Sequence, residues 1–208
     1  NRPEALRGMN VKVSIYRFDG TRDSNQSYQV AEVPGSSTMK VVQLEVSARI
    51  TPLYFIELEL TDQAGQLLST NFYWQHVAQD QFDGLMNLPN VVLDAQASAR
   101  YEGDKIMVTV TLRNPGGNVA LLTHLQLHQK KSGRRVLPAF YSDNYITLAP
   151  GKASTVTVEA ANKDLQGDEP LVEVDGYNVD VKPVDGPVGI ALNSNAQPSH
   201  WPESQIVP

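Results

Sequence analysis

The sequence predicts an all-β protein made of two consecutive β-sandwich domains followed by an extended C-terminal tail. Three observations lead to this prediction: apolar and polar residues alternate in short stretches, turn residues separate these stretches, and no long helical periodicity interrupts them. A period of two is typical of half-buried antiparallel strands, because successive side chains of a strand point to opposite faces of the sheet.

The first domain is predicted over residues 1–75. Turns are expected at Asp19-Gly20 and Pro34-Gly35, because these residue pairs suit backbone conformations that other residues avoid. The expected strands cover residues 11–16, 28–33, 38–46, 54–60 and 66–74. These stretches are enough for a sandwich of about seven strands or slightly fewer.

The alternation breaks over residues 76–90, which we interpret as a linker, and restarts in a second domain over residues 91–182. Strands are expected there at 91–101, 105–113, 119–128, 136–141, 145–148, 154–160 and 171–181. Strands that recur every ~8 to 12 residues favour an immunoglobulin-like β-sandwich. Residues 183–208 contain five prolines and little alternation, so they are predicted to form the extended tail.

Composition excludes several classes of partner and site. The net charge of -6 divides evenly between the two predicted domains, so a basic stripe for nucleic acid is not expected. Cysteine is absent, which excludes disulfides and thiolate metal sites. No apolar run approaches the ~20 residues of a membrane span. Because the chain does not begin with Met, we expect the native polypeptide to start upstream.

Two histidines and several acidic pairs were considered as catalytic or metal-binding residues. His124 and His128 are four residues apart in a predicted strand, which separates them by roughly 13 Å, too far for one metal ion. We expect them on a solvated outer face together with Gln126.

Glu57 with Glu59, and Glu173 with Asp175, have the spacing of two glycosidase carboxylates, but any acidic strand places such pairs on one face. We therefore expect no catalytic residue, no metal ligand and no cofactor in this chain. A calcium ion held by loop carbonyl groups stays open as an alternative.

Two aromatic clusters carry more information. In the first cluster, Phe72 and Trp74 flank Tyr73 and therefore share one face of the predicted strand. We expect Phe72 and Trp74 in the core or at a seam between the two domains. The second cluster combines aromatic, hydroxyl, carboxylate and amide groups that could contact sugar rings, although a core or seam position competes with that role. Its residues are Tyr141, Ser142, Asp143, Asn144 and Tyr145.

These clusters lie within a longer pattern of short motifs. The pattern runs through residues 69–74, Leu88-Pro89, Arg113-Asn114-Pro115, residues 141–151 and residues 174–179. In order and spacing it resembles the C-terminal immunoglobulin-like domains of glycoside hydrolase family 2 enzymes, and it is most similar to exo-β-D-glucosaminidases and β-mannosidase-like members. The resemblance covers roughly residues 8–182.

The resemblance implies accessory domains of a larger retaining exo-β-glycosidase that acts on glucosamine- or mannose-type glycans. In that family both catalytic glutamates lie in a (β/α)₈ barrel, which needs ~250 residues and cannot be contained here. The implied partners are this barrel, in the same polypeptide, and a glycan. The implied location is secreted or periplasmic. The cluster 141–145 is expected to face the barrel or the glycan.

Two alternatives stay open at this point. The chain could be an autonomous carbohydrate-binding or adhesive module, whose aromatic residues bind glycan directly. It could also be a structural repeat of a cell-surface protein that has no ligand.

Overall fold

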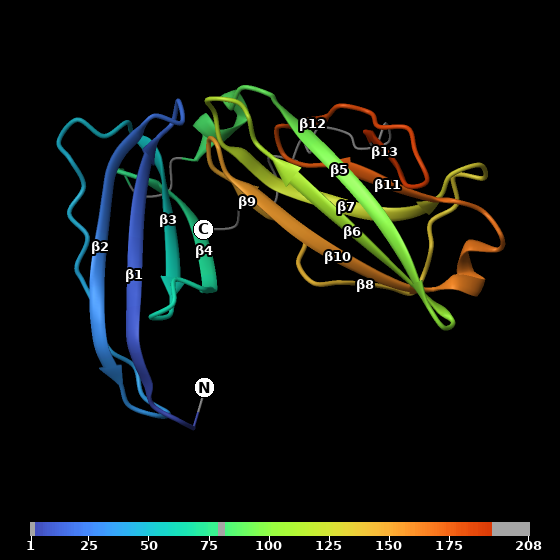
Figure 1. Cartoon of the computed structure of the whole chain (residues 1–208). Helices are drawn as coiled ribbons and strands as arrows, with labels where there is room; N and C mark the ends of the chain where they lie inside the picture. The colour runs from blue at the N-terminus through green and yellow to red at the C-terminus, as the bar shows by residue number, and fades with distance from the viewer. Residues whose placement is uncertain (1–2, 79–81, 193–208) are drawn as a thin grey trace, which may run out of the picture. The chain divides into compact units, whose positions relative to one another are not determined.

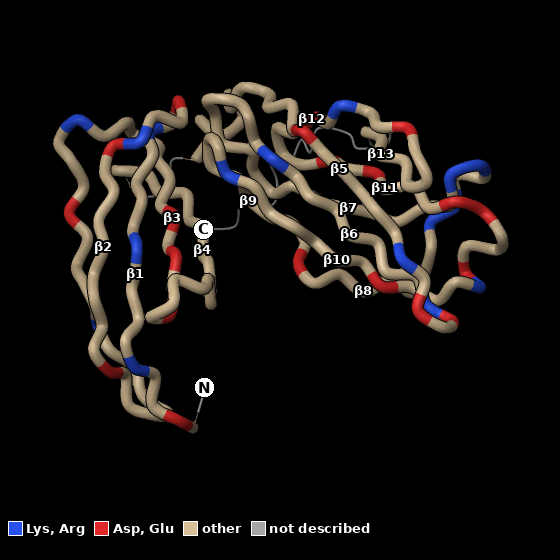
Figure 2. Tube along the Cα trace, viewed as in Figure 1, with Lys and Arg blue, Asp and Glu red and all other residues tan. Residues whose placement is uncertain are grey.

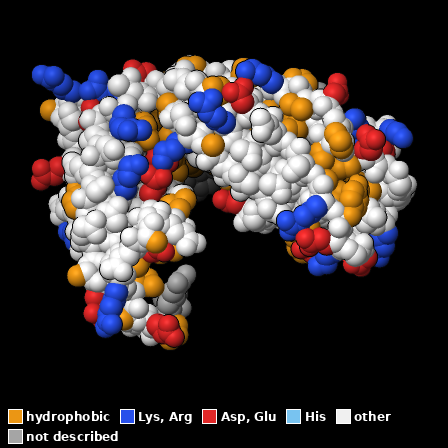
Figure 3. Space-filling view, viewed as in Figure 1, with side chains coloured by type: hydrophobic (Ala, Val, Ile, Leu, Met, Phe, Trp, Pro, Cys, Tyr) orange, Lys and Arg blue, Asp and Glu red, His pale blue; other side chains and the backbone are white. Residues whose placement is uncertain are grey.

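The computed structural model describes residues 3–78 and 82–192. It divides into two compact units, residues 1–88 and residues 89–208, and each is described by itself. Regular structure in the described residues consists of thirteen strands and two short 3₁₀ helices, which confirms the predicted all-β fold class (Figure 1). Acidic and basic residues are mixed over both units (Figure 2), and their side chains are interspersed on the face of the molecule drawn in Figure 3.

The first unit contains a four-stranded antiparallel sheet in the order β2-β1-β3-β4 (Figure 1). Its strands are β1 (Leu6–Arg17), β2 (Arg22–Val33), β3 (Leu53–Thr61) and β4 (Leu67–His76). The Asp19 side chain accepts a hydrogen bond from the Thr21 backbone N–H (2.9 Å) in the turn between β1 and β2. The 3₁₀ helix η1 (Asp83–Asn87) follows the sheet.

The sheet buries side chains on both faces: Tyr16 and Phe55 are buried on one face, and a small apolar cluster lies on the other. Val13 of β1 lies opposite Leu58 of β3, and Ile15 lies opposite Ile56, so their side chains share a face. The buried cluster on this face is formed by Val13, Ile15 and Tyr54. Leu44 and Ile50, from the segment between β2 and β3, are among the partly buried side chains that pack against it. This segment therefore covers part of the apolar face.

The first unit differs from the predicted sandwich at residues 38–46, where a strand was expected. The structure has no strand there, and the strands described in this unit form a single sheet. The segment has the residue types of a strand, but a strand also needs a partner for its backbone hydrogen bonds. Such a partner is not present among residues 3–78 and 82–88.

The second unit is a sandwich of two sheets, with strand orders β12-β5-β6-β10-β8 and β13-β11-β7-β9 (Figure 1). The first sheet contains β5 (Val91–Glu102), β6 (Lys105–Arg113), β8 (Ala139–Tyr141), β10 (Ala153–Ala161) and β12 (Val179–Val181). The second contains β7 (Ala120–Gln129), β9 (Ile146–Leu148), β11 (Pro170–Asp175) and β13 (Gly189–Leu192). The 3₁₀ helix η2 (Asn162–Leu165) follows β10.

The core of the second unit lies between these two sheets. Alternate residues of each strand point into it, as the pattern in β6 and β7 shows. The inward side chains of β6, namely Ile106, Val108, Val110 and Leu112, are fully buried, as the alternation predicted. They belong to the same buried cluster as Leu125 and Leu127 of β7 and Val172 and Val174 of β11.

The predicted tail over residues 183–208 needs a correction at its start. Residues Gly189–Leu192 form β13, which pairs in parallel with β11 and places Ile190 opposite Val172. Val188 and Ile190 are buried in the core of the second unit. Two apolar residues at alternate positions therefore make this part of the chain a strand of the sandwich. Residues 193–208 lie outside the described residues.

Candidate functional site

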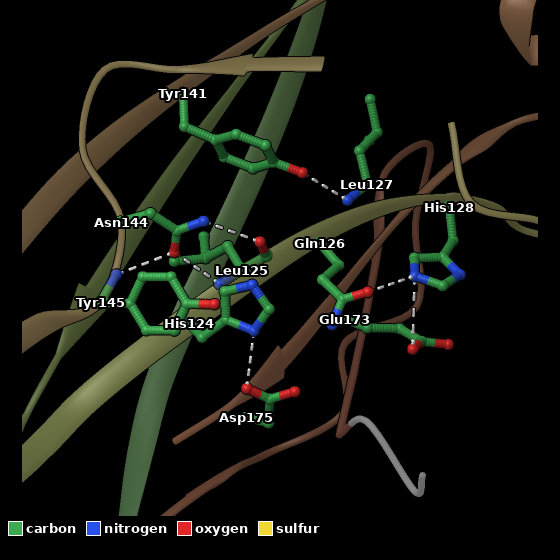
Figure 4. Close-up of polar contacts among 10 residues, drawn as sticks. All are labelled: His124, Leu125, Gln126, Leu127, His128, Tyr141, Asn144, Tyr145, Glu173 and Asp175. Carbon is green, nitrogen blue, oxygen red and sulfur yellow. Dashed lines mark hydrogen bonds and ion pairs between the residues drawn. The ribbon is translucent and has the colours of Figure 1, made fainter. Parts of the chain in front are cut away.

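The predicted cluster 141–145 forms the connection between β8 and β9, and so crosses from one sheet of the sandwich to the other. Figure 4 shows that three of its side chains, Tyr141, Asn144 and Tyr145, point toward β7. Residues 142–145 form a loop between these strands, and the structure shows which side chains hold this loop in place.

Tyr141 anchors the beginning of the loop. It lies at the end of β8, opposite Val158 of β10, and its hydroxyl oxygen accepts a hydrogen bond from the Leu127 backbone N–H (2.9 Å). Burial raises the pKa of the Tyr141 phenol, and the hydrogen bond from Leu127 opposes this only in part. Tyr141 is therefore a structural link between the two sheets.

Ser142 and Asp143 continue the loop with local hydrogen bonds. The Ser142 backbone N–H donates to the Thr157 carbonyl oxygen (2.9 Å), and the Thr157 N–H donates to the Ser142 hydroxyl oxygen (2.9 Å). The Asp143 carboxylate accepts from the Asn144 N–H (2.8 Å). Both residues thus fix the loop backbone.

Asn144 replaces a strand partner for β7. Its Oδ1 accepts a hydrogen bond from the Leu125 N–H (2.9 Å), and its Nδ2 donates to the Leu125 carbonyl oxygen (3.0 Å). The same Oδ1 accepts from the Tyr145 N–H (3.0 Å). The side-chain amide therefore satisfies both backbone groups of a residue just beyond the last pair of β7 and β9, Thr123 with Ile146.

Tyr145 is the member of the cluster that presents an aromatic ring to solvent. Its backbone has a positive φ of 56°, and 60% of the residue is exposed. The ring stacks on the His124 imidazole, with 4.5 Å between ring centroids and 11° between ring planes. The His124 Nδ1 lies 2.9 Å from Asp175 Oδ1. Tyr145, His124 and Asp175 therefore form one connected group (Figure 4).

A second histidine–carboxylate pair lies further along the same face. His128 Nε2 is 3.6 Å from Glu173 Oε2 and 3.3 Å from Gln126 Oε1, while its Nδ1 is 3.0 Å from the Gly133 carbonyl oxygen. The prediction that His124, Gln126 and His128 share a face is confirmed by their alternation along β7.

The predicted solvation of the two histidines is wrong. Only 14% of the His124 side chain and 12% of the His128 side chain are exposed. Pairing with β11 places a carboxylate beside each ring. Asp175 lies directly opposite His124, and Glu173 lies opposite Gln126, from where it reaches the His128 ring two residues further along β7.

The acidic pairs proposed and rejected as glycosidase carboxylates have partners in the structure. Glu57 accepts a hydrogen bond from the Tyr16 hydroxyl (3.0 Å), and Glu59 pairs with Lys12 (2.9 Å). Glu173 and Asp175 lie beside different histidines. Within residues 3–78 and 82–192, no group of three or more His, Asp or Glu side chains is arranged to hold a metal ion. In the same residues no helix is long and apolar enough to cross a membrane.

Phe72 and Trp74 share one face of β4, as their spacing predicted. The Phe72 ring lies 5.7 Å from the Phe55 ring, whereas Trp74 is 37% exposed. Phe72 therefore packs on the sheet of its own unit. A position of the two residues at a seam between domains stays a prediction.

A family model described as the exo-beta-D-glucosaminidase Ig-fold domain matches residues 71–179, from within β4 to the first residue of β12. This range is more than half of the 208 residues. The chain belongs to this family. The predicted resemblance and the immunoglobulin-like fold class are thus confirmed.

Two curated relatives and one solved structure support the same family. An exo-beta-D-glucosaminidase of Streptomyces avermitilis is 33% identical over 202 residues, which covers 86% of this chain and 22% of that protein. One of Amycolatopsis orientalis is 27% identical over 206 residues, with 88% and 20% covered. The crystal structure of Amycolatopsis orientalis exo-chitosanase CsxA matches with a TM-score of 0.77 at 25% identity, and covers 85% of this chain and 23% of that chain.

The chain therefore spans about a fifth of the length of the curated relatives that it matches. It corresponds to an immunoglobulin-fold part of larger proteins, and the activity of those proteins is considered below as a proposal.

Two further asparagines in the family-matched region were not recognised as structural residues from the sequence. Asn114 is fully buried, and its Nδ2 donates to the carbonyl oxygens of Asn118 (2.8 Å) and Leu148 (2.9 Å). Its Oδ1 accepts from the Gly116 N–H (2.9 Å). An Asn just before a Pro-Gly turn is a detectable signal for this last bond, because Asn side chains often accept from the backbone two residues on.

Asn178 joins three segments of the second unit. Its Nδ2 donates to the carbonyl oxygens of Pro89 (2.7 Å) and Val119 (2.9 Å), and its Oδ1 accepts from the Leu121 N–H (2.9 Å). These partners lie far from it in the sequence, so no local pattern indicates the role of Asn178.

Proposed function

We propose that this chain is a non-catalytic accessory part of a larger retaining exo-β-glycosidase that acts on glucosamine- or mannose-type glycans. In this proposal its two units pack on a (β/α)₈ catalytic barrel of the same polypeptide. The observation that carries it is the length of the match: the chain corresponds to about a fifth of proteins named exo-beta-D-glucosaminidase. The matched region is the immunoglobulin-fold domain.

The surroundings of the carboxylates support a non-catalytic role. A retaining glycosidase needs one carboxyl group that is protonated and a second that is ionised, at ~5 to 5.5 Å from each other. Glu173 and Asp175 each lie beside a histidine of β7, and both face the outside of a filled sandwich. Both carboxylates thus contact side chains of the neighbouring strand β7.

Activity assays on two polypeptides test this proposal. The full-length polypeptide is expected to release glucosamine from the non-reducing end of chitosan oligosaccharides, while residues 1–208 alone are expected to release none. Hydrolysis by the isolated 208-residue chain would contradict the proposal, and so would a full-length polypeptide without glycosidase activity on either glucosamine or mannose glycosides.

We further propose that the loop 141–145 faces the barrel or the glycan through Tyr145. Tyr141 and Asn144 bind backbone groups of β7, so they set the position of the loop. Tyr145 is 60% exposed and its ring is held against His124, which makes it a rigid aromatic surface. Aromatic rings of this kind stack well on the apolar faces of sugars and on other side chains.

The substitution Tyr145→Ala in the full-length enzyme tests the role of the loop. We expect KM for chitosan oligosaccharides to rise about 10-fold, which corresponds to about 1.4 kcal/mol of lost binding. Tyr101→Ala is the matched control, because Tyr101 is also an exposed tyrosine of the second unit and lies outside the loop. Unchanged kinetics for Tyr145→Ala, together with an unchanged melting temperature, would reject this role.

An autonomous carbohydrate-binding module is the second candidate, and the exposed Tyr145 ring beside the polar groups of β7 and β11 favours it. It predicts that the isolated chain binds chitosan or mannan oligosaccharides. Isothermal titration calorimetry with residues 1–208 distinguishes the two candidates, because the accessory role requires no such affinity.

A further inference from the structure

Three unfavourable features lie together where β7 pairs with β9. Leu122 of β7 has a positive φ of 54°, and Tyr145, just before β9, has a positive φ of 56°. Both values are uncommon for residues other than Gly, Asn or Asp, because the Cβ atom crowds the backbone in this conformation. Next to Leu122, Thr123 is fully buried, and its hydroxyl has no hydrogen-bond partner among the described residues. Features of this kind cluster at functional sites, where neighbouring contacts hold them in place.

Leu122 lies in a β-bulge of β7. Ala120 lies opposite Leu148. Thr123, three residues further along β7, lies opposite Ile146, two residues back along β9. β7 therefore has one residue more than β9 between these two pairs. Such an extra residue interrupts the ladder locally and re-aims the side chains that follow it.

Three hydrogen bonds hold the bulge in place. The Leu121 N–H donates to Asn178 Oδ1 (2.9 Å), and the Leu121 carbonyl oxygen accepts from the Tyr177 N–H (2.9 Å). The Leu122 N–H donates to Thr147 Oγ1 (3.3 Å). These bonds satisfy backbone groups that the interrupted ladder with β9 does not pair. The extra residue is therefore a fixed feature of the sandwich.

The bulge decides which side of the sheet Tyr145 faces. If the register of Ala120 and Leu148 continued unchanged, Tyr145 would lie opposite Thr123, whose side chain is fully buried. After the bulge the register has moved by one residue, and its continuation places Tyr145 opposite His124, on the outer face. A slip of one residue exchanges the two faces of a strand. Without the bulge, the Tyr145 ring would therefore be directed at the core.

Two contacts show that the register after the bulge extends into the loop. The continued register places Asn144 opposite Leu125, and the Asn144 amide binds both backbone groups of Leu125 (2.9 and 3.0 Å). It places Tyr145 opposite His124, and the two rings stack with 4.5 Å between their centroids. Figure 4 shows both contacts side by side on β7.

We propose that Leu122 is a positioning residue for Tyr145. Its left-handed backbone conformation forms the bulge, the bulge sets the register of β7 against β9, and this register directs the Tyr145 ring outward onto His124. The inference rests on the proposed function, in which Tyr145 faces the barrel or the glycan. A sugar ring of the glycan would then stack on the face of the Tyr145 ring opposite His124.

Two substitutions at Leu122 separate backbone conformation from side-chain packing. Leu122→Ile keeps the number of side-chain atoms but places a β-branched residue at a positive φ, which such residues avoid. Leu122→Gly removes the side chain but adopts a positive φ without strain. We expect Leu122→Ile to lose the stack of Tyr145 on His124, and Leu122→Gly to retain it. The reverse result, or a stack that both variants retain, would overturn the proposal.

NMR spectra of residues 1–208, recorded at one pH, measure the stack. The Tyr145 ring shields the His124 imidazole protons, so their resonances lie upfield of the positions that they have in Tyr145→Ala. In Leu122→Ile these resonances are expected at the Tyr145→Ala positions, and in Leu122→Gly at those of the unmodified protein. A purely structural role of the Leu122 side chain predicts a lower melting temperature for Leu122→Gly and no rescue of the stack.

Gln166→Ile is the matched control. Gln166 has the same φ of 54° but lies at the end of η2, outside β7 and outside the loop. This variant is expected to lower the melting temperature and to leave the His124 resonances in place. Loss of the stack in Gln166→Ile as well would show an unspecific effect and would overturn the proposal.

Thr147→Val provides a second test in case Leu122→Ile does not fold. It replaces only the hydroxyl that accepts from the Leu122 N–H, and so loosens the bulge without a change of backbone strain. The His124 resonances are expected to move toward their Tyr145→Ala positions. Resonances that do not move would overturn the proposal.

Kinetics of the full-length polypeptide connect the register to the glycan. Leu122→Ile is expected to raise KM for chitosan oligosaccharides about 10-fold, as Tyr145→Ala does, and Leu122→Gly is expected to keep the unmodified KM. The proposed function can fail separately. A lost stack with unchanged KM in both Leu122→Ile and Tyr145→Ala would reject only the proposed contact with the glycan. A raised KM in Leu122→Ile with an intact stack would reject only this inference.

Discussion

Three asparagine side chains replace backbone partners in the second unit. Asn114 and Asn178 bind carbonyl oxygens and N–H groups near the ends of strands, and Asn144 binds both backbone groups of Leu125 in β7, where the ladder with β9 has stopped. All three belong to the short motifs on which the family resemblance was based. The asparagines of these motifs therefore have a structural role, because a buried backbone group without a hydrogen-bond partner lowers the stability of the fold.

At the residue scale, Asn178→Ala is expected to destabilise the second unit by about 3 kcal/mol. It removes bonds to the Pro89 and Val119 carbonyl oxygens and leaves the buried Leu121 N–H without a partner. Urea denaturation measures the loss. The control Asn90→Ala, at an exposed neighbouring position, should stay within about 0.5 kcal/mol of the unmodified protein. A loss below about 1 kcal/mol for Asn178→Ala would contradict the assigned role.

Tyr141 makes stability depend on pH in the alkaline range. Burial raises its pKa in the folded state above the ordinary tyrosine value of about 10. The contribution of the protonated Tyr141 phenol to the free energy of unfolding is therefore complete below about pH 10, and it is lost as the pH rises through the raised folded pKa. Tyr141→Phe should lower the free energy of unfolding by about 1 kcal/mol at neutral pH, because the Leu127 N–H loses its acceptor.

Stability curves of both proteins between pH 8 and 11 check this prediction. Tyr16 and Tyr177 also have raised pKa values, so the unmodified protein and the variant will both lose stability at high pH. Only the difference between the two curves reports on Tyr141. It should shrink as the pH rises above about 10, and a difference that stays constant would show that the pKa of Tyr141 is the same in the folded and unfolded states.

At the scale of elements, the strands of the second unit could be predicted because their two faces differ. In β6 and β10 each inward position is an aliphatic residue or Ala, and neighbours in sequence form hairpins. In the first unit, residues 38–46 also have apolar residues at alternate positions, but they form no backbone hydrogen bonds with a neighbouring strand among the described residues. Propensity is a local property, whereas the partner that a strand needs can lie far away in the sequence.

The candidate site was predictable to the same extent. The clustering of Tyr141 and Tyr145 with polar residues predicted that they face the barrel or the glycan, which stays a prediction. The structure places the cluster at the crossing between two sheets. The sequence could not show that Asn144 binds β7 or that Tyr145 stacks on His124. Both contacts depend on pairings across 19 or more residues, and on the positive φ of Tyr145, which no residue type requires.

Strand β13 carries the next prediction. Ile190 is 2% exposed in the core, so Ile190→Ala should lower the free energy of unfolding of the second unit by about 3 kcal/mol. Leu192→Ala is the matched control, because Leu192 lies in the same strand but is 40% exposed, and its loss should be below about 1 kcal/mol. Equal losses from both variants in chemical denaturation would show that β13 is not part of the core.

At the scale of the whole molecule, the two units differ in how their cores are built. The second unit encloses a continuous cluster between two sheets, with residues from all of β5, β6, β7, β10 and β11. In the first unit Val13, Ile15 and Tyr54 form a small buried cluster on one face of a single sheet, and Tyr16 and Phe55 are buried on the other face. Domains are normally stable when two layers enclose a core, so the second unit should be the more independent one.

Separate expression of the two units tests this difference. Residues 89–208 are expected to fold alone, with a strand-rich circular dichroism spectrum, dispersed amide resonances and one cooperative unfolding transition of about 5 to 15 kcal/mol. Residues 1–88 are expected to unfold at much lower urea concentration or to aggregate, because a single sheet buries less apolar surface than two packed sheets to offset its conformational entropy. If residues 1–88 were as stable as residues 89–208, a single sheet would be as stable as a two-layer sandwich, and the expected difference between the two units would be wrong.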